Sequence, residues 1–80
     1  MPLYFFDFRD GEDLILDEEG LDLRDMMAVQ REAARALAGL AADSMASFKD
    51  SQVHQMAIAV RDKSGPVMEV EFSFTIIHTQ

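Results

Sequence analysis

Acidic side chains cluster near the start of the chain, and a group of carboxylates is a usual ligand set for calcium. An EF-hand loop needs oxygen ligands at its first, third and fifth positions, Gly at the sixth and Glu at the twelfth, and no frame here supplies them with flanking helices. We therefore predict no metal site and expect a solvated hairpin end, with a weak cation site left open. The cluster comprises Asp7, Asp10, Glu12, Asp13, Asp17, Glu18 and Glu19.

Nucleophilic and acid–base catalysis have few candidate residues. The chain has no cysteine, and its serines are scattered, without a nucleophile pattern such as G-x-S-x-G. Two histidines are present, and we interpret His54 as a satisfied histidine at the rim of the core and His78 as part of a frayed tail. The sequence predicts a protein that is not an enzyme, with no catalytic residue and no cofactor.

The net charge restricts the class of partner. Seven basic and fifteen acidic residues in an 80-residue chain give a net charge of −8. Nucleic acids and anionic membranes attract proteins through Lys and Arg, so we expect neither as a partner. No segment has the pattern of an export signal or the roughly 20 apolar residues of a transmembrane helix. With no cysteine to form disulfides, we expect a cytoplasmic protein.

The first predicted element is a hairpin of two strands, residues 3–8 and 13–17, around the turn signal Asp10-Gly11. A two-residue turn sets Ile15 opposite Phe6, whereas a three-residue loop sets Leu14 opposite Phe8. Residues 14–16 are all apolar, so the pattern leaves the register open. The inward face of the first strand carries Tyr4, Phe6 and Phe8.

A helix is predicted over residues 26–47, capped by Asp25 or Asp22. Mid-helix Gly39, among many alanines, suggests the close approach of another backbone. Spacings of three and four define an apolar stripe of Met26, Val29, Ala33, Ala36, Leu37, Leu40 and Ser44. A flank of Met27, Ala34, Ala38, Ala41 and Met45 widens the apolar arc to roughly half of the circumference.

A second hairpin is predicted from about Val53 to Ile76. A three-residue loop at residues 63–65 pairs Val60 with Met68, Ile58 with Val70, Met56 with Phe72 and His54 with Phe74, keeping apolar residues opposite one another. A two-residue loop would oppose Val60 to Glu69. We expect the first and last strands to be central, because they are the longest and most apolar.

These elements predict a single domain, residues 1–80, of the α+β class: a ββαββ unit with one helix on a four-stranded, mainly antiparallel sheet. One helix leaves the second face of the sheet uncovered, and we call this the outer face. Large exposed apolar patches usually mark interaction surfaces. The predicted surface comprises Leu3, Phe5, Ala57, Ala59, Val67, Ile77 and either Ile15 or Leu16 on the outer face, with Met27, Ala34, Ala38 and Met45 on the helix flank.

Several segments carry a family resemblance: MPLYFFDFRDG, DEEGLDL, the Ala- and Arg-rich helix and VRDKSGPVMEVEFSF. Together they resemble a family of small bacterial proteins of unknown function, common in alphaproteobacteria. The resemblance covers nearly the whole chain and implies a ββαββ domain. It implies no activity, ligand or catalytic residue.

We predict a non-enzymatic protein-interaction module that binds itself as a homodimer or binds another protein. One alternative is a small-ligand binder or weak enzyme with a pocket between helix and sheet near His54. A further alternative, suggested by the charge alone, is an acidic decoy that occupies the basic site of a nucleic-acid-binding protein.

Overall fold

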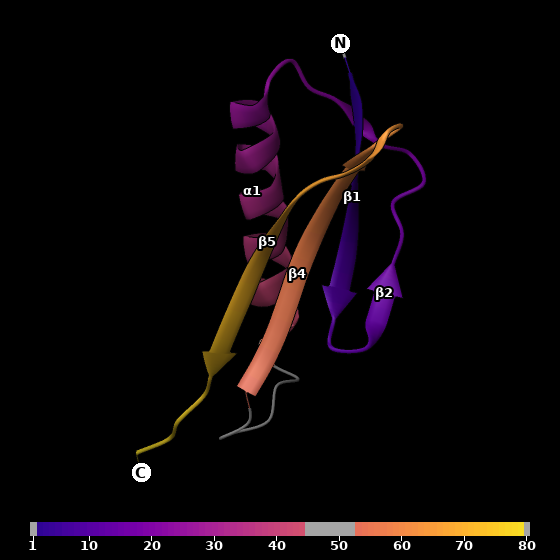
Figure 1. The fold of residues 1–80 in the computed structure, drawn as a ribbon. Helices are drawn as coiled ribbons and strands as arrows, with labels where there is room; N and C mark the ends of the chain where they lie inside the picture. Colours follow the sequence, from indigo (N-terminus) through magenta and orange to yellow (C-terminus); the bar gives the residue numbers. More distant parts are fainter. Residues whose placement is uncertain (1, 45–52, 80) are drawn as a thin grey trace.

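One helix packs on one face of a five-stranded antiparallel sheet, so the predicted α+β class is confirmed (Figure 1). The computed structural model describes residues 2–44 and 53–79. Compared with the prediction, the structure adds one short strand, β3, before the helix. The elements in chain order are β1 (Leu3–Asp10), β2 (Asp13–Ile15), β3 (Leu21–Asp22), α1 (Met26–Ser44), β4 (Val53–Asp62) and β5 (Gly65–Thr75).

The strands lie in the order β2-β1-β4-β5, and β3 also pairs with β1. The expectation that the last strand is central is therefore wrong, because β5 is an edge strand. Composition explains the difference. In β4, Ala57 points outward and is as buried as the inward-facing Met56 and Ile58, whereas β5 carries the exposed Glu69 and Glu71 on its outward side. Small outward residues allow β4 to lie between two neighbours.

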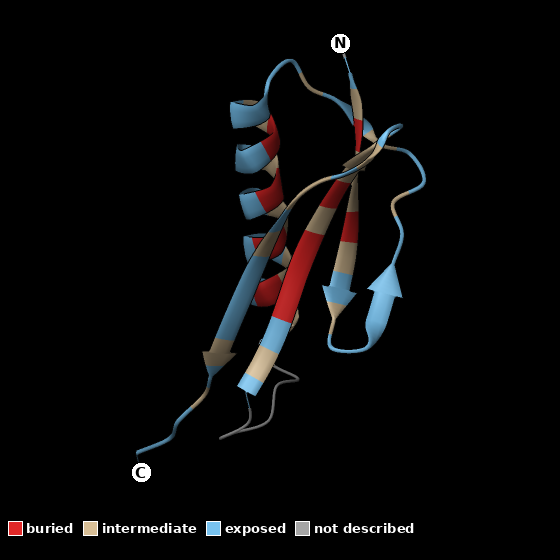
Figure 2. Ribbon diagram, viewed as in Figure 1, coloured by how far each residue is buried: buried red, intermediate tan, exposed pale blue. Residues whose placement is uncertain are grey.

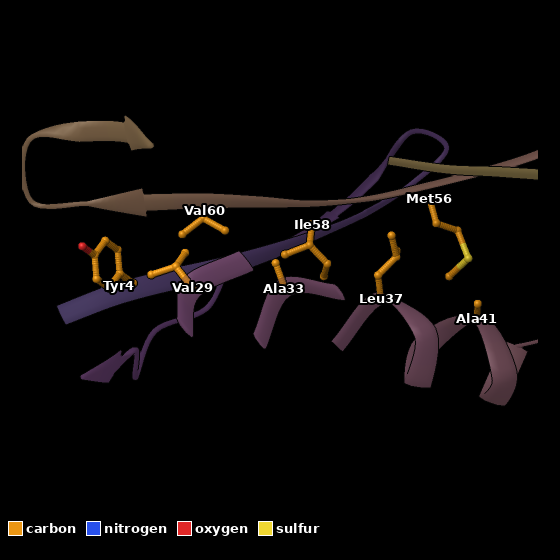
Figure 3. Close-up of a cluster of buried hydrophobic side chains, with 8 residues drawn as sticks. All are labelled: Tyr4, Val29, Ala33, Leu37, Ala41, Met56, Ile58 and Val60. Atoms are coloured by element: carbon orange, nitrogen blue, oxygen red, sulfur yellow. The ribbon is translucent and has the colours of Figure 1, made fainter. Parts of the chain in front are cut away.

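The core lies between α1 and the inward side of β4 (Figure 3). Residues four apart in a helix are about 6 Å apart along its axis, and residues two apart in a strand are about 6.7 Å apart. Helix and strand therefore present matching rows of side chains, with Ala33 facing Ile58. The core comprises Tyr4 from β1, Val29, Ala33, Leu37 and Ala41 from α1, and Met56, Ile58 and Val60 from β4.

Helix α1 begins as predicted, because the Asp25 carboxylate accepts a hydrogen bond of 2.8 Å from the N–H of Ala28. Two expectations along the helix are wrong. Ala41, assigned to the flank, is buried in the core. Gly39 is exposed, and among the described residues no atom beyond its own stretch of helix lies within 4 Å of a Cβ placed there. The predicted end at residue 47 lies outside the described residues.

The two hairpins differ in how well the pattern predicted them. In the first, the turn residues are Gly11 and Glu12, so Ile15 lies opposite Phe8. Neither expected register is correct, because Gly11 takes a positive φ of 61° at the first turn position and Asp10 stays in the strand. In the second, the four predicted pairs are confirmed. They arise from a two-residue turn combined with a register shift between Val60 and Arg61, rather than from a three-residue loop.

Candidate functional site

The outer face centres on Asp7, the buried charged side chain of the described residues, which is 6% exposed. Arg61 donates to it through Nε (2.8 Å to Oδ2) and Nη2 (3.4 Å to Oδ1). The N–H of Asp17 donates to the same Oδ1 at 2.9 Å. The buried carboxylate is thus both paired and hydrogen-bonded, as burial of a charge requires.

Asp17 bridges a gap in the edge strand beside β1. β2 pairs with residues 8–10 of β1 and β3 with residues 3–4, which leaves Phe6 between them. The Asp17 carboxylate fills this gap: Oδ2 accepts from the N–H of Phe6 at 3.1 Å, and Oδ1 accepts from Glu19 and Gly20 at 3.1 and 3.3 Å. Arg61 Nη2 also donates to the Asp17 carbonyl at 3.0 Å. These bonds fasten the acidic turn, residues 17–20, to the sheet.

The hydrogen bonds to Asp17 change its acidity. Burial by itself raises the pKa of this carboxyl, but the N–H groups of Phe6, Glu19 and Gly20 outweigh it, together with the positive charge of Arg61. The pKa of Asp17 therefore lies below its ordinary value. The ionised form is the one that holds the turn.

The same turn covers Leu3 and Phe5, which the sequence left on an open face. The Arg61 guanidinium lies over the Phe5 ring, with Cζ 4.5 Å from the ring centroid. Gly20 has a φ of 76°, and a Cβ there would lie 3.0 Å from side-chain carbons of both Leu3 and Phe5. Leu3 and Phe5 are consequently half-buried.

The other residues of the predicted surface are spread over unlike environments. Ala57 is buried, Ala59 is half-buried, and Val67 packs against the core. Ile77 is 72% exposed, beyond the end of β5. On the helix flank the exposed residues are Met27, Ala34 and Ala38, whereas Met45 lies outside the described residues. The described residues of the predicted surface therefore do not form one continuous apolar patch.

One alternative prediction was a ligand pocket between helix and sheet near His54. His54 is half-buried on β4, and its ring centroid lies 5.4 Å from that of Phe74. Two shallow hollows of about 570 and 460 Å³ lie over β1, β4 and β5, and no residue of α1 lines either of them. Within residues 2–44 and 53–79, no three His, Asp or Glu side chains are grouped to hold a metal ion. In this part of the chain, no helix combines the length and the apolar character that crossing a membrane requires.

Comparison with known proteins identifies the family. Residues 3–73 match a family described as a domain of unknown function, DUF6894. The chain belongs to this family. No curated protein and no solved structure matches the chain. The match extends from the first residue of β1 into β5, so the DUF6894 domain includes the helix, the Asp7 and Asp17 hydrogen bonds and all but the end of the sheet.

The most continuous exposed apolar segment among the described residues was not recognised as a unit from the sequence. Leu14, Ile15 and Leu16 are 58%, 62% and 57% exposed, and we call them the hydrophobic edge. Side chains alternate between the two faces of a strand, so three consecutive apolar residues cannot all serve one core. The sequence analysis assigned only one of them, Ile15 or Leu16, to the predicted interaction surface, whereas all three are exposed together.

We expect Asp17→Asn to lower stability most at neutral pH. A carboxyl whose folded-state pKa is depressed stabilises the fold above its unfolded-state pKa of about 3.9, and the contribution is lost as the pH falls through the lower folded-state value. The free energy of unfolding, measured by urea titration, should differ from wild type by about 1–2 kcal/mol at pH 7 and by less near pH 3. Glu18→Gln, in the same turn, is the matched control. An equal difference at both pH values for Asp17→Asn would contradict this role.

Proposed function

We propose that this DUF6894 domain is a non-enzymatic interaction module that docks a partner protein along its hydrophobic edge. The observation that carries the proposal is the run Leu14, Ile15 and Leu16, each more than half exposed, of which Leu14 and Ile15 lie on the edge strand β2 and Leu16 directly follows it. Figure 2 shows β2 exposed along its length, away from the buried side of α1. Exposed apolar segments at a sheet edge are typical docking surfaces.

The backbone of this edge supports docking by an added strand. The N–H of Phe6 points away from β4, toward Asp17, and in an antiparallel ladder this direction alternates along the strand. Phe8 and Asp10 therefore direct their N–H and C=O groups to their partners Ile15 and Asp13. The N–H and C=O of Leu14, between these two, point outward, where no strand of the described chain pairs with β2. A partner strand would hydrogen-bond there.

The charges around the edge favour a partner of opposite charge. Acidic residues flank the three apolar side chains on both sides: Glu12, Asp13, Asp17, Glu18 and Glu19. The fitting partner is an extended apolar segment flanked by Lys or Arg, because opposite charges at the rim accelerate association and exclude wrong partners. As part of the same proposal we place the domain in the cytoplasm, where a chain without cysteine has no need of oxidation.

The test is a variant with three changes, Leu14→Ser, Ile15→Thr and Leu16→Ser. Burying one such side chain at an interface contributes about 1.5–3 kcal/mol, so the triple variant should weaken binding of a captured partner at least about 100-fold. Met27→Ser with Ile77→Thr is the matched control, because both residues are exposed and apolar but lie elsewhere. Affinity is measured by titration calorimetry. Retained affinity in a folded triple variant, or equal losses in the control, would overturn the proposal.

A further inference from the structure

The opposite edge of the sheet is a different surface: β5 is eleven residues long, and no other described strand pairs with its outer side. We propose that β5 pairs antiparallel with β5 of a second copy of the chain, forming a symmetric homodimer. This inference is independent of the hydrophobic edge, which lies at the far side of the sheet. Figure 1 shows β5 and β2 on opposite sides of the central strands.

One backbone hydrogen bond and the strand pairing show which N–H and C=O groups of β5 point away from β4. The N–H of Gly11 donates to the carbonyl of Gln55, so odd-numbered residues of β4 direct their groups toward β1. Even-numbered residues of β4 then face β5, and Ile58 bonds to its partner Val70. The N–H and C=O groups that point away from the sheet are those of Glu69, Glu71, Ser73 and Thr75.

Charge restricts the register of such a dimer, and the length of strand that can pair then decides between the registers that remain. A two-fold axis perpendicular to the sheet keeps each side chain on its own face, so one residue lies opposite its own copy. An axis at Phe72 sets Glu71 opposite Ser73 and Glu69 opposite Thr75. An axis at Glu69, Val70 or Glu71 would instead place two glutamates directly opposite each other, which is destabilising. An axis at Ser73 also separates the glutamates, but it pairs only residues 71–75 of the strand instead of 69–75.

The apolar side of β5 is consistent with the axis at Phe72. Phe72 is 40% exposed, and its ring centroid lies 5.0 Å from that of Phe74. In the dimer the two Phe72 rings meet at the axis, and Val70 of each copy lies opposite Phe74 of the other. Aromatic pairs across strands are among the stabilising contacts of antiparallel sheets. The half of β5 with Glu69 and Glu71 is therefore compatible with its own half carrying Ser73 and Thr75, which is why we propose a second copy as the occupant.

Engineered cysteines test the register, because the chain has no cysteine of its own. Phe72→Cys places two thiols at a directly opposed, non-hydrogen-bonded pair, where Cα atoms are about 4.5 Å apart and a disulfide can form. Ser73→Cys places them diagonally, beyond disulfide reach. Under mild oxidation, most of the Phe72→Cys protein should migrate as a covalent dimer on a non-reducing gel, and little of the Ser73→Cys protein. Cross-linking of Ser73→Cys alone, or of neither variant, would overturn the proposed register.

Removing one backbone N–H donor from β5 tests whether the two strands pair. Ser73→Pro removes an outward N–H and leaves the ladder between β4 and β5 intact, as proline at an edge strand can. Light scattering should give a dimer mass for wild type and for Ser73→Ala, and a monomer mass for Ser73→Pro. The triple variant of the hydrophobic edge should remain dimeric, which separates this inference from the proposed function. A monomeric wild type would overturn the proposal and assign Glu69 and Glu71 to guarding a free edge.

Discussion

Replacing Arg61 with methionine should lower the free energy of unfolding by about 3 kcal/mol, the lower end of the range for breaking a buried ion pair. Methionine retains much of the length of the side chain but removes both donors to Asp7 and the donor to the Asp17 carbonyl. Asp7 would stay buried, with only the Asp17 N–H as a described partner. The Arg61 side chain is 38% exposed, which is why we expect the lower end. Urea unfolding at pH 7 measures the effect.

Two control experiments test whether loss of the buried Asp7–Arg61 pair causes the drop in the free energy of unfolding. Asp7→Asn removes the charge, so Arg61→Met should cost at least about 1 kcal/mol less in that background, as a double-mutant cycle measures. Arg9→Met breaks the pair with Glu69, whose side chains are 46% and 39% exposed, and exposed pairs contribute about 1 kcal/mol or less. If Arg61→Met cost no more than Arg9→Met, the turn at residues 17–20 would be held by other contacts.

The sequence correctly predicted two kinds of feature: those set by residues close together in the chain, and those set by a strict alternation of apolar and polar residues. Asp25 caps the helix because its carboxylate reaches an N–H three residues later. The pairing of β4 with β5 follows from apolar residues that alternate on both strands, since a slip by one position would turn them to solvent. In the first hairpin, three consecutive apolar residues remove that constraint, and the register was not predictable. Gly11, not Asp10, begins the turn.

The cover on the outer face could not be predicted, because its parts are far apart in the chain. Arg61 is 54 residues from Asp7 and 44 from Asp17. Nothing in the local pattern distinguishes Arg61 from the exposed Arg31 or Arg35. The need for glycine at position 20 likewise becomes clear only in the folded structure, where the Leu3 and Phe5 side chains pack against it. Because that face is partly covered, the surfaces left open are the two edges of the sheet. Which strands form the edges depends on the strand order. The apolar content of β5 predicted a central strand, but β5 is an edge strand.

The core gives the second large expected effect: Ile58→Ala should lower the free energy of unfolding by about 3–4 kcal/mol. Ile58 is 1% exposed at the middle of β4, and the helix residue facing it is Ala33 (Figure 3). The Ala33 side chain is too short to fill the cavity that Ile58→Ala leaves, and cavities that cannot collapse are the most destabilising. A domain of this size has a total stability of about 4–12 kcal/mol, so much of it would be lost. The urea midpoint and thermal unfolding measure this.

Graded substitutions separate cavity formation from a general loss of apolar surface. Ile58→Val removes one methylene and should cost about 1 kcal/mol. Ile77→Ala removes the same atoms as Ile58→Ala from a side chain that is 72% exposed, and surface changes of this kind stay within about 0.5 kcal/mol. If Ile58→Ala cost no more than Ile77→Ala, α1 would not be packed on β4 as described.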